Sequence, residues 1–495
     1  MRYLDLKSHI PFLLFLFVFG LFIASLYQRY PQGDEGLIAE HVYHFEKEGY
    51  VKSKLGAGYR DDSESLEHRQ YFYHKLFVLT GVLFMKLFGF HIYTFKAVSL
   101  FFLLVFFLFL YFYFKKFLRL QCWKTFFFVT ASLVLFNAHI FDFGFLYRPE
   151  IMAMTLGFIS FYFLQKGLVD QPNYLWMLIS GMFAGLSAFT HLNGVIYPFA
   201  GGLLLIFKKE FRSVVFFTIT ACFFTLLYFF DIHSVEEFNS LWNQFTTDGV
   251  VIAKKPFYMS LLKEHQRFFH SIVEISFSVL LLFSLFFNFK YLKNNFNNIM
   301  LYLLFLVIGL GLFAHGRAPY YGIHYTPYIA LIIAVSCLNI FSQKNKTLKI
   351  AQSILLLGFV VVNGVQNEQT IAKKIDIAAH NARLSALIPE KQVKIAAPSV
   401  FIFEEISHYE SIRSDMAYYT HTDHFHIGEQ KTVEGLLRFS CERGDKYILI
   451  DKYTTGFSFF KDASKLDLNL NGVIAGCQLI HKSDTYFIFK NLNIR

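Results

Sequence analysis

Long apolar runs constrain this chain more than any other feature of its sequence. The first, IPFLLFLFVFGLFIASLY, begins at Ile10 and contains no charged residue. An apolar run of roughly 17–25 residues is the length that crosses the hydrocarbon core of a bilayer as a helix. The composition agrees, because 55% of the 495 residues are hydrophobic and only 17% are charged. The sequence therefore predicts a polytopic α-helical membrane protein rather than a soluble globule.

Eleven segments have the length and apolarity of membrane spans. They cover residues 10–27, 92–114, 123–138, 151–165, 174–190, 194–207, 212–230, 270–289, 298–314, 322–341 and 349–366. The first is followed by QRYPQGDE without a small-x-small cleavage site, so we expect an uncleaved span and not a signal peptide. A twelfth stretch, residues 75–90, is nearly as apolar, but Lys75, Lys86 and Gly89 weaken it as a span.

The positive-inside rule decides how often the chain crosses the membrane. If 75–90 lies along the outer surface, the basic residues beside the spans all fall inside: Arg2, Lys7, Lys115, Lys116, Arg119, Lys124, Lys166, Lys208, Lys209, Arg212, Lys290, Lys293, Lys344, Lys346 and Lys349. If 75–90 crosses, every group after Lys7 moves outside. We therefore expect eleven spans in the plasma (inner) membrane, with a cytoplasmic N-terminus and an extracytoplasmic, periplasmic C-terminus. The net charge of +10 then needs no nucleic-acid partner.

This topology brings the unusual polar residues together on the outer face. The outer segments are 28–91, 139–150, 191–193, 231–269, 315–321 and the tail. They hold Asp34, Glu35, His74, Lys75, Asp142, Arg148, Glu150, His191, His315 and Arg317, with His324 just inside the next span. Ionisable groups near helix ends in a bilayer are costly and tend to be functional. Each of them alone is more often an interfacial anchor, so their convergence on one face is what indicates a site.

The composition changes at about residue 368, where a soluble domain is expected. Residues 393–403, 445–453 and 485–492 read as strands, and 380–388 and 433–443 read as helices. The chain thus divides into a transmembrane domain, 1–367, with outer loops 28–91 and 231–269, and a small outer α/β domain, 368–495. Cys441 and Cys477 both lie in this tail. Whether they form a disulfide is left open, since sequence separation does not test geometry.

Five stretches, in order along the chain, carry a resemblance to a known family. They are GDEGLIAEHVYHFEKEG, YFYHKLFVLTGVLFMKLFG, LYRPEIMAMTLGFISFYFL, GLSAFTHLNGVIYPFAGGLLLI and GRAPYYGIHYTPYIALIIA. Together they resemble the class C (GT-C) glycosyltransferases of family 39, the group of protein O-mannosyltransferases and the aminoarabinose transferase of lipid A. The chain departs from the family pattern in two places: Leu76 follows His74-Lys75 where Pro is usual, and His191 stands where Lys is usual.

The resemblance implies a membrane enzyme that moves a hexosyl or pentosyl group from a polyprenyl-phosphate donor to a hydroxyl of a lipid, glycan or protein acceptor, with inversion. Such a displacement needs a carboxylate to accept the hydroxyl proton, which fits Asp34 with Glu35 as its partner. It also needs cations or hydrogen-bond donors on the departing phosphate. The candidates for that role are Lys75, His74, Arg148, His191, Arg317, Tyr320, Tyr321 and His324. Arg317 is the best of these, because a guanidinium binds two oxygens at once.

Each assignment has an alternative. Asp34 would also suit a helix cap, with Glu35 on the positive end of the helix dipole. Arg148 and Glu150 would also suit a structural ion pair, and the tyrosines an aromatic belt. A divalent cation is left open, since Asp34, Glu35 and a distant His do not make a convincing oxygen site. For the whole chain, the alternatives are a transporter or flippase of a lipid-linked glycan, and a polymerase or ligase of surface polysaccharide.

Overall fold

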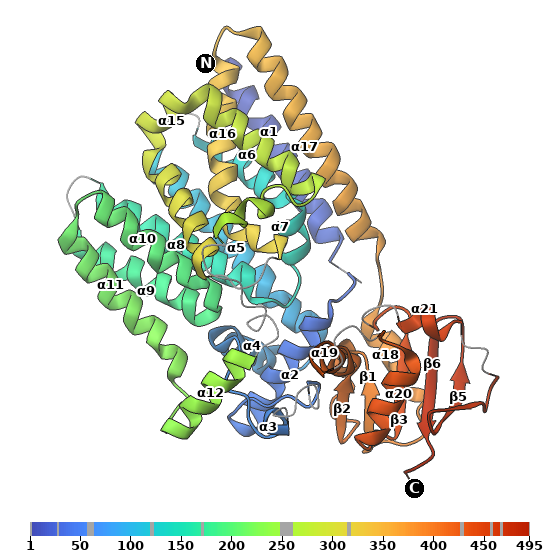
Figure 1. Cartoon of the computed structure of the whole chain (residues 1–495). Helices are drawn as coiled ribbons and strands as arrows, with labels where there is room; N and C mark the ends of the chain where they lie inside the picture. The colour runs from blue at the N-terminus through green and yellow to red at the C-terminus, as the bar shows by residue number, and fades with distance from the viewer. Residues whose placement is uncertain are drawn as a thin grey trace.

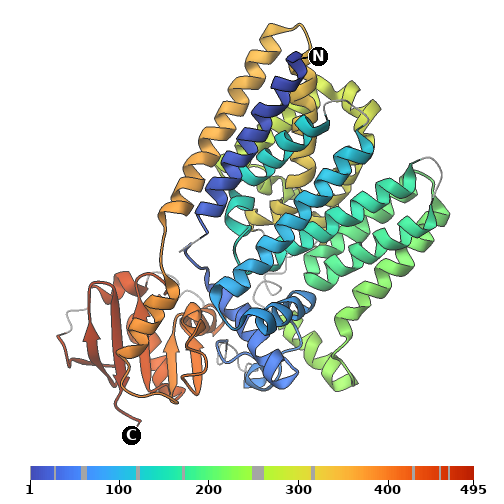
Figure 2. The same cartoon turned by 180° about the vertical axis from the view of Figure 1, so that it is seen from behind.

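The computed structural model describes residues 2–26, 29–56, 64–118, 123–169, 173–247, 261–313, 318–425, 430–455, 459–465 and 469–494. Two of the polar residues singled out above, His315 and Arg317, lie outside these ranges. The described part of the chain forms a large bundle of long helices and a smaller domain built on a sheet, with a layer of short helices beside both (Figures 1 and 2).

The bundle accounts for all eleven apolar segments. Its helices are α1 (Arg2–Ala24), α5 (Ile92–Phe117), α6 (Trp123–Phe136), α8 (Pro149–Leu168), α9 (Tyr174–Thr190), α10 (Ile196–Phe207), α11 (Phe211–Leu226), α15 (Ile272–Phe313), α16 (Thr326–Ser342) and α17 (Lys346–Ala372). The backbone of α15 leaves helical geometry at Asn288 and Phe296, so this element consists of two helices that match the segments 270–289 and 298–314. The predicted fold class, a polytopic helical membrane protein with a small C-terminal α/β domain, is confirmed.

The helices differ in how they meet their surroundings. Within the described residues, five helical stretches are long and apolar enough to cross a membrane by length and composition: those of α5, α8, α11 with the turn after it, α15 and α17. The apolar part of α8 is 78% buried, whereas that of α17 is only 17% buried. Helix α8 is therefore central in the bundle. The exposed faces of α11 and α17 carry large apolar side chains such as Phe223 and Leu357, as expected for faces in contact with lipid.

The C-terminal domain is a mixed six-stranded sheet in the order β2-β1-β3-β6-β5-β4. The strands are β1 (Lys394–Ala397), β2 (Ser411–Ser414), β3 (Tyr447–Asp451), β4 (Val473–Ile474), β5 (Cys477–Lys482) and β6 (Tyr486–Asn491), and β1 runs parallel to β2 and β3 while the other pairs are antiparallel. Helices α18 (Ile377–Ala386), α19 (Asp415–Phe425), α20 (Val433–Glu442) and α21 (Phe459–Ala463) belong to this domain. A disulfide joins Cys441 of α20 to Cys477 of β5.

One predicted strand is wrong over half its length. Strand β1 ends at Ala397, and residues Ser399–Ile402 form a 3₁₀ turn, η6, instead of continuing to 403. Pro398 has no N–H to give to a neighbouring strand, so the ladder stops there. The turn packs on α2 (Gly33–Glu48), where the Ser399 hydroxyl donates to the carbonyl of Gly33 at 2.7 Å. A Cβ on Gly36 would lie 2.3 Å from the carbonyl oxygen of Ser399, so only glycine allows this approach.

Short helices lie at the end of the bundle nearest the sheet (Figure 1). They include α2, α3 (Glu64–His68), α4 (Lys75–Phe88), α7 (Ala138–Phe143), α12 (Val235–Thr247), and the 3₁₀ turns η2 (Leu192–Val195), η3 (Leu227–Phe229), η4 (Glu264–Arg267) and η5 (Pro319–His324). One apolar core joins Val42 of α2, Phe77 of α4 and Phe95 of α5 to Phe401 and Phe403 of the sheet domain. The position of α2 is therefore fixed by the bundle and by the sheet domain together.

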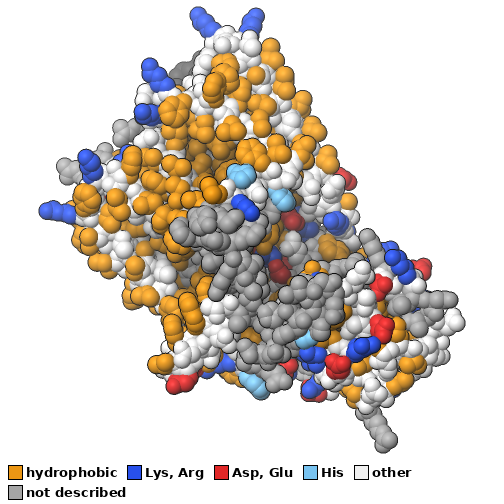
Figure 3. All heavy atoms as spheres, in the orientation of Figure 1, with side chains coloured by type: hydrophobic (Ala, Val, Ile, Leu, Met, Phe, Trp, Pro, Cys, Tyr) orange, Lys and Arg blue, Asp and Glu red, His pale blue; other side chains and the backbone are white. Residues whose placement is uncertain are grey.

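Charge is distributed unevenly along the bundle. Figure 3 shows Lys and Arg side chains at the end of the bundle farthest from the sheet, with no acidic side chains among them on this face. The acidic side chains visible in this view lie toward the sheet domain and the short helices. This distribution of charge agrees with the positive-inside pattern of the sequence, in which basic residues gather on one side of the membrane.

Candidate active site

Asp34 lies in the first turn of α2 but does not cap it. The helix follows Gln32, which is the N-cap residue, and Asp34 and Glu35 are the acidic residues of the first turn. The side chain of Asp34 is 42% exposed, and its carboxylate forms an ion pair with the guanidinium of Arg148. The interpretation of Asp34 as a helix cap is therefore wrong. The structure presents this carboxylate to solvent with one oxygen held by a cation.

Arg148 contacts side chains from three parts of the chain. It is the N-cap residue of α8, in an extended conformation, and Pro149 begins the helix. Its Nη2 lies 2.9 Å from Glu150 Oε1 and 3.2 Å from the hydroxyl oxygen of Tyr320, while its Nη1 meets Asp34. Burial alone would lower the pKa of this guanidinium, but Glu150 and Asp34 outweigh burial and hold the pKa above its ordinary value. Arg148 therefore stays charged at the centre of the cluster.

Glu150 and Glu35 are both buried. Glu150 holds the Arg148 cation in place, whereas Glu35 holds two backbone N–H groups. Glu150 has no exposed side-chain surface and is neutralised by Arg148, so the expected Arg148–Glu150 pair is present. Glu35 accepts hydrogen bonds from the backbone N–H groups of Gln32 and Tyr147, both at 2.8 Å. Burial raises the pKa of the Glu35 carboxyl, and nearby Lys96 opposes that rise. Glu35 thus ties the start of α2 to the residue before Arg148, which is the role of a positioning residue.

Two histidines stack beside this cluster. The rings of His74 and His191 lie 4.8 Å apart and nearly parallel, and the ring of Tyr321 meets His191 edge-on at 6.0 Å. Burial, reinforced by neighbouring His324 and Arg148, lowers the pKa of His191 to about 3, so the ring is neutral at pH 7. Its Nδ1 accepts from the N–H of Asn193 at 2.9 Å, which leaves Nε2 as a hydrogen-bond donor.

Lys75 does not have the surroundings that phosphate binding requires. Its ammonium group has no exposed surface and forms an ion pair with Asp231, which also accepts a hydrogen bond from the hydroxyl of Tyr73 at 2.9 Å. The rings of Tyr73 and Tyr228 both lie 5.0 Å from the Lys75 nitrogen. This closed environment gives no support to the prediction that Lys75 binds phosphate, and indicates that the pair anchors α4 to the segment after η3.

The remaining predicted residues fall into three groups. His324 is buried, and its Nδ1 lies 3.0 Å from the hydroxyl of Tyr197, so it faces the interior of the bundle. Tyr320 and Tyr321 both reach the cluster, Tyr320 through Arg148 and Tyr321 through His191. Arg317, the strongest phosphate candidate in the sequence, lies outside the described residues, and its assignment stays a prediction.

One cation at this site was not predicted from the sequence. Arg267 is buried, with its guanidinium 5.4 Å from the ring centre of Tyr321 and its Nε 3.0 Å from Glu264. The hydroxyl of Tyr325 donates to the same Glu264 at 2.6 Å. A signal was available, because Arg267 is a basic residue directly before a span on the side where the positive-inside rule disfavours one. A charge in such a position is most easily retained if it has a function.

The described residues do not fit a metal site. No group of three or more His, Cys, Asp or Glu side chains that could hold a metal ion occurs among them. Asp34 faces a cation, and the Glu35 oxygens accept backbone N–H groups, so neither carboxylate is arranged as one of several ligands around a cation. What the cluster offers is an exposed carboxylate, a fixed guanidinium, neutral imidazole and two tyrosine side chains. Those groups can accept a proton from one molecule and donate hydrogen bonds to an anion.

No family model matches the chain, and no curated protein matches its sequence. Among solved structures, the fold is similar to that of ArnT from Cupriavidus metallidurans bound to undecaprenyl phosphate, with a TM-score of 0.58, 9% sequence identity and 98% of both chains covered. It is also similar to the oligosaccharyltransferase AglB from Archaeoglobus fulgidus in complex with an inhibitory peptide and a dolichol-phosphate, with a TM-score of 0.51, 9% identity, and 90% of this chain and 70% of that chain covered. A structure of the Archaeoglobus fulgidus oligosaccharyltransferase with Zn and sulfate matches with a TM-score of 0.53, 9% identity, and 97% of this chain and 74% of that chain covered.

Sequence identities this low establish a similarity of fold and nothing beyond it. The match to ArnT, the lipid A aminoarabinose transferase, nevertheless extends over nearly the whole of both chains, sheet domain included. The chain therefore has the GT-C membrane fold.

Proposed function

We propose that this protein is a membrane glycosyltransferase that moves a sugar from a polyprenyl-phosphate donor to a hydroxyl group of a lipid, glycan or protein acceptor. The observation that carries the proposal is the pairing of the exposed Asp34 carboxylate with Arg148 at the edge of a GT-C bundle. Structural neighbours with this fold bind undecaprenyl phosphate or dolichol-phosphate. A donor with a long lipid chain also explains why the enzyme is embedded in a membrane, because the reacting phosphate lies at the bilayer edge.

In the proposed reaction, Asp34 accepts the proton of the acceptor hydroxyl as its oxygen attacks the anomeric carbon. The bond between that carbon and the phosphate oxygen breaks, and its electron pair leaves with the lipid phosphate. Displacement from the opposite side inverts the anomeric configuration. Arg148 holds the Asp34 carboxylate in one orientation, and Glu35 fixes the helix that carries it.

The departing phosphate gains negative charge and needs preorganised donors. The described groups around Arg148 that can supply them are the Nε2 of His191, the hydroxyl of Tyr320 and Arg148 itself. No step is assigned to a metal ion, since the described carboxylates do not fit one. Arg317 is kept as a further phosphate ligand on the strength of its sequence context.

We also propose the orientation of the chain. The short helices and the sheet domain would lie on the outer side of the plasma (inner) membrane, and the N-terminus in the cytoplasm. The basic end of the bundle, visible in Figure 3, supports this orientation because cytoplasmic loops carry an excess of Lys and Arg. The division into domains 1–367 and 368–495 is part of the proposal, with α17 ending at Ala372, a little beyond the predicted boundary.

The test compares cells with and without the gene, complemented by the wild type, Asp34→Asn or Asp484→Asn. Asp484 is an exposed aspartate in the turn before β6, and its replacement is the matched control. We expect loss of the gene to raise the pool of a polyprenyl-phosphate sugar and to remove a sugar from surface glycans, lipids or proteins. Asp484→Asn should restore both and Asp34→Asn neither. Complementation by Asp34→Asn would remove Asp34 from the chemistry.

A further inference from the structure

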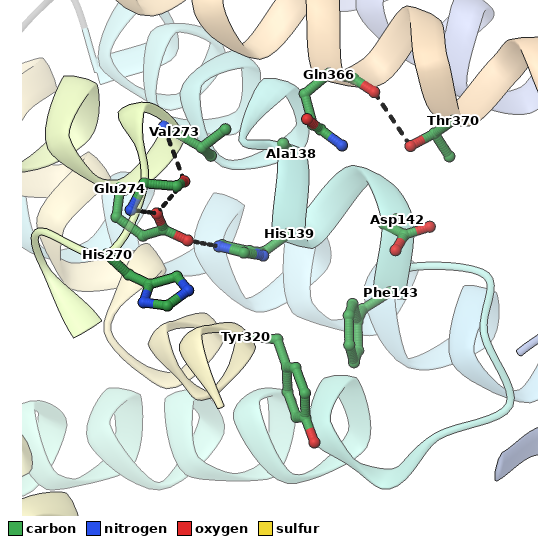
Figure 4. A pocket seen from close by; sticks show the side chains of 11 residues that line it. Ala138, His139, Asp142, Phe143, His270, Val273, Glu274, Tyr320, Gln366 and Thr370 are labelled. Carbon is green, nitrogen blue, oxygen red and sulfur yellow. Dashed lines mark hydrogen bonds and ion pairs between the residues drawn. The ribbon is translucent and has the colours of Figure 1, made fainter. Parts of the chain in front are cut away.

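A cavity of about 290 Å³ opens beside the Arg148 cluster, bounded by α7, α15, α17 and η5 (Figure 4). Phe143 and Tyr320 form part of its wall, with their rings stacked at 4.9 Å. The guanidinium of Arg148 lies over the same two rings, 5.4 Å from the centre of Phe143 and 4.9 Å from that of Tyr320. A molecule in the cavity would therefore share an aromatic wall with the pair formed by Arg148 and Asp34.

Polar side chains in the wall have hydrogen-bonding atoms that the described residues do not use. The main-chain oxygen of Asp142 accepts from Arg29 at 3.0 Å, but its carboxylate has no hydrogen bond or ion pair to a described side chain. The side-chain amide of Gln366 and the ring of His270 likewise have no hydrogen-bond partner within the described ranges. In Figure 4 these groups stand around the cavity on α7, on α17 and in the bend before α15.

The fourth polar group is held in one tautomer by its partner. Glu274 accepts from His139 Nε2 at 2.7 Å and from the backbone N–H of Ser271 at 2.8 Å. In the neutral ring this leaves Nδ1 of His139 as a hydrogen-bond acceptor. The second ring nitrogen lies on the side of the ring that faces Asp142 (Figure 4). The described wall of the cavity therefore presents the Asp142 carboxylate, the Gln366 amide and two imidazole rings to a ligand.

These features select a class of ligand. No Lys or Arg occurs among the described residues that line the cavity, and two of those residues, Asp142 and Glu274, carry carboxylates, so this part of the wall does not favour a phosphate group. Carboxylate and imidazole acceptors beside an aromatic wall suit a ring that carries several hydroxyl or amino groups and also has an apolar face. The volume of about 290 Å³ lies just below the range of about 300–1,000 Å³ for ligand sites, which suits one ring rather than a lipid chain.

We propose that this cavity binds a single sugar ring with hydroxyl or amino groups, from the donor or from the acceptor, while Asp34 and Arg148 act on the reacting atoms. This inference rests on the proposed function, and it separates recognition of the sugar from recognition of the phosphate. Gln366, on the exposed face of α17 and at the cavity wall, then becomes a specificity-determining residue.

The test uses Gln366→Trp, which places an indole in the cavity, and Gln369→Trp as its matched control. Gln369 is the same residue type, is exposed on the same helix and does not line the cavity. The thermal midpoint of the purified full-length protein is measured with methyl glucoside, methyl mannoside, methyl glucosaminide and methyl glucuronide, and separately with undecaprenyl phosphate. At least one of the first three glycosides should raise the midpoint of the wild type and of Gln369→Trp but not of Gln366→Trp, whereas undecaprenyl phosphate should raise all three.

Equal responses of the two tryptophan variants to every glycoside, no response of the wild type to the first three glycosides, or a response only to the glucuronide would overturn the assignment. A glycoside response that separates the two variants, together with no response to undecaprenyl phosphate in any protein, would instead count against the proposed function and leave the cavity assignment standing.

Binding of undecaprenyl phosphate glucose and undecaprenyl phosphate mannose distinguishes a donor sugar from an acceptor sugar. If the cavity holds the donor sugar, one of these should bind the wild type about tenfold tighter than bare undecaprenyl phosphate. Gln366→Trp should remove that difference. If it holds the acceptor, the variant should bind both lipids like the wild type and lose transfer only.

Discussion

Arg148 holds two carboxylates whose replacement should have opposite consequences. Its guanidinium pairs with Glu150, whose side chain has no exposed surface, and with Asp34, whose side chain is 42% exposed. Removing one partner of a buried ion pair costs about 3–5 kcal/mol, because the remaining charge is uncompensated. A pair that is open to water on one side contributes about 1 kcal/mol or less. We therefore expect Glu150→Gln to lower the free energy of unfolding by roughly 3 kcal/mol, at the lower end because the amide oxygen still accepts from Arg148. Asp34→Asn should lower it by about 1 kcal/mol at most.

The order reverses for catalysis. Loss of a general base lowers turnover by about 10²–10⁴-fold, so Asp34→Asn should be folded and almost inactive. Glu150→Gln should lower the yield of folded protein more than the turnover of the protein that remains folded. The assay pairs the apparent thermal midpoint in detergent with sugar transfer per folded molecule, measured on the same preparations. Two variants of equal stability, or normal turnover by Asp34→Asn, would contradict the reasoning.

Three further predictions concern the surroundings of the site. Burial holds the pKa of His191 at about 3, below its ordinary value of 6.5. The stability that the neutral ring contributes is therefore present above about pH 6.5 and is lost as the pH falls toward 3. His191→Asn should flatten the measured dependence of the free energy of unfolding on pH between these values. Gly36→Ala should lower the thermal midpoint, with a cost of about 1–3 kcal/mol from overpacking against the sheet domain, whereas Gly20→Ala, which meets nothing within 4 Å, should not lower it. Lys75→Met should lower the thermal midpoint, because it leaves the Asp231 carboxylate without its cation. Adding Asp231→Asn should recover much of the lost stability, since the unpaired charge is then removed as well. If the second replacement does not recover stability, a phosphate-binding role for Lys75 would be favoured again.

The spans could be read from the sequence, since a helix that crosses hydrocarbon must be apolar over its whole length. The kinked element α15 shows that a polar stretch also marks where one span ends and the next begins. Its two helices adjoin across residues 290–297, whose polar sequence KYLKNNFN separates the two predicted spans. The strand prediction failed after Ala397 because the turn there is stabilised by packing on α2, which lies more than 300 residues away in the sequence.

The residues of the site could be predicted from the sequence, but the contacts among their side chains could not. Asp34 and Glu35 are adjacent in the sequence, and nothing local indicates that one faces solvent while the other is buried and accepts a hydrogen bond from the backbone of Tyr147. Arg148 was expected to pair with Glu150, two residues away, and it does, but its contact with Asp34 depends on how α2 docks. Lys75 finds its partner in Asp231, 156 positions along the chain, so its burial could not have been foreseen. Long-range packing, which single-sequence patterns do not encode, decides these contacts.

The central claim is that one bond at an anomeric carbon is exchanged for another, with Asp34 as the base. The most direct measurement uses the reconstituted full-length protein with a polyprenyl-phosphate sugar and its acceptor, and determines the anomeric configuration of the product and the amount of free lipid phosphate. We predict an inverted configuration, one lipid phosphate released for each sugar transferred, and neither product with Asp34→Asn. Movement of the intact lipid-linked sugar across the bilayer without cleavage, or transfer with retained configuration, would contradict the account.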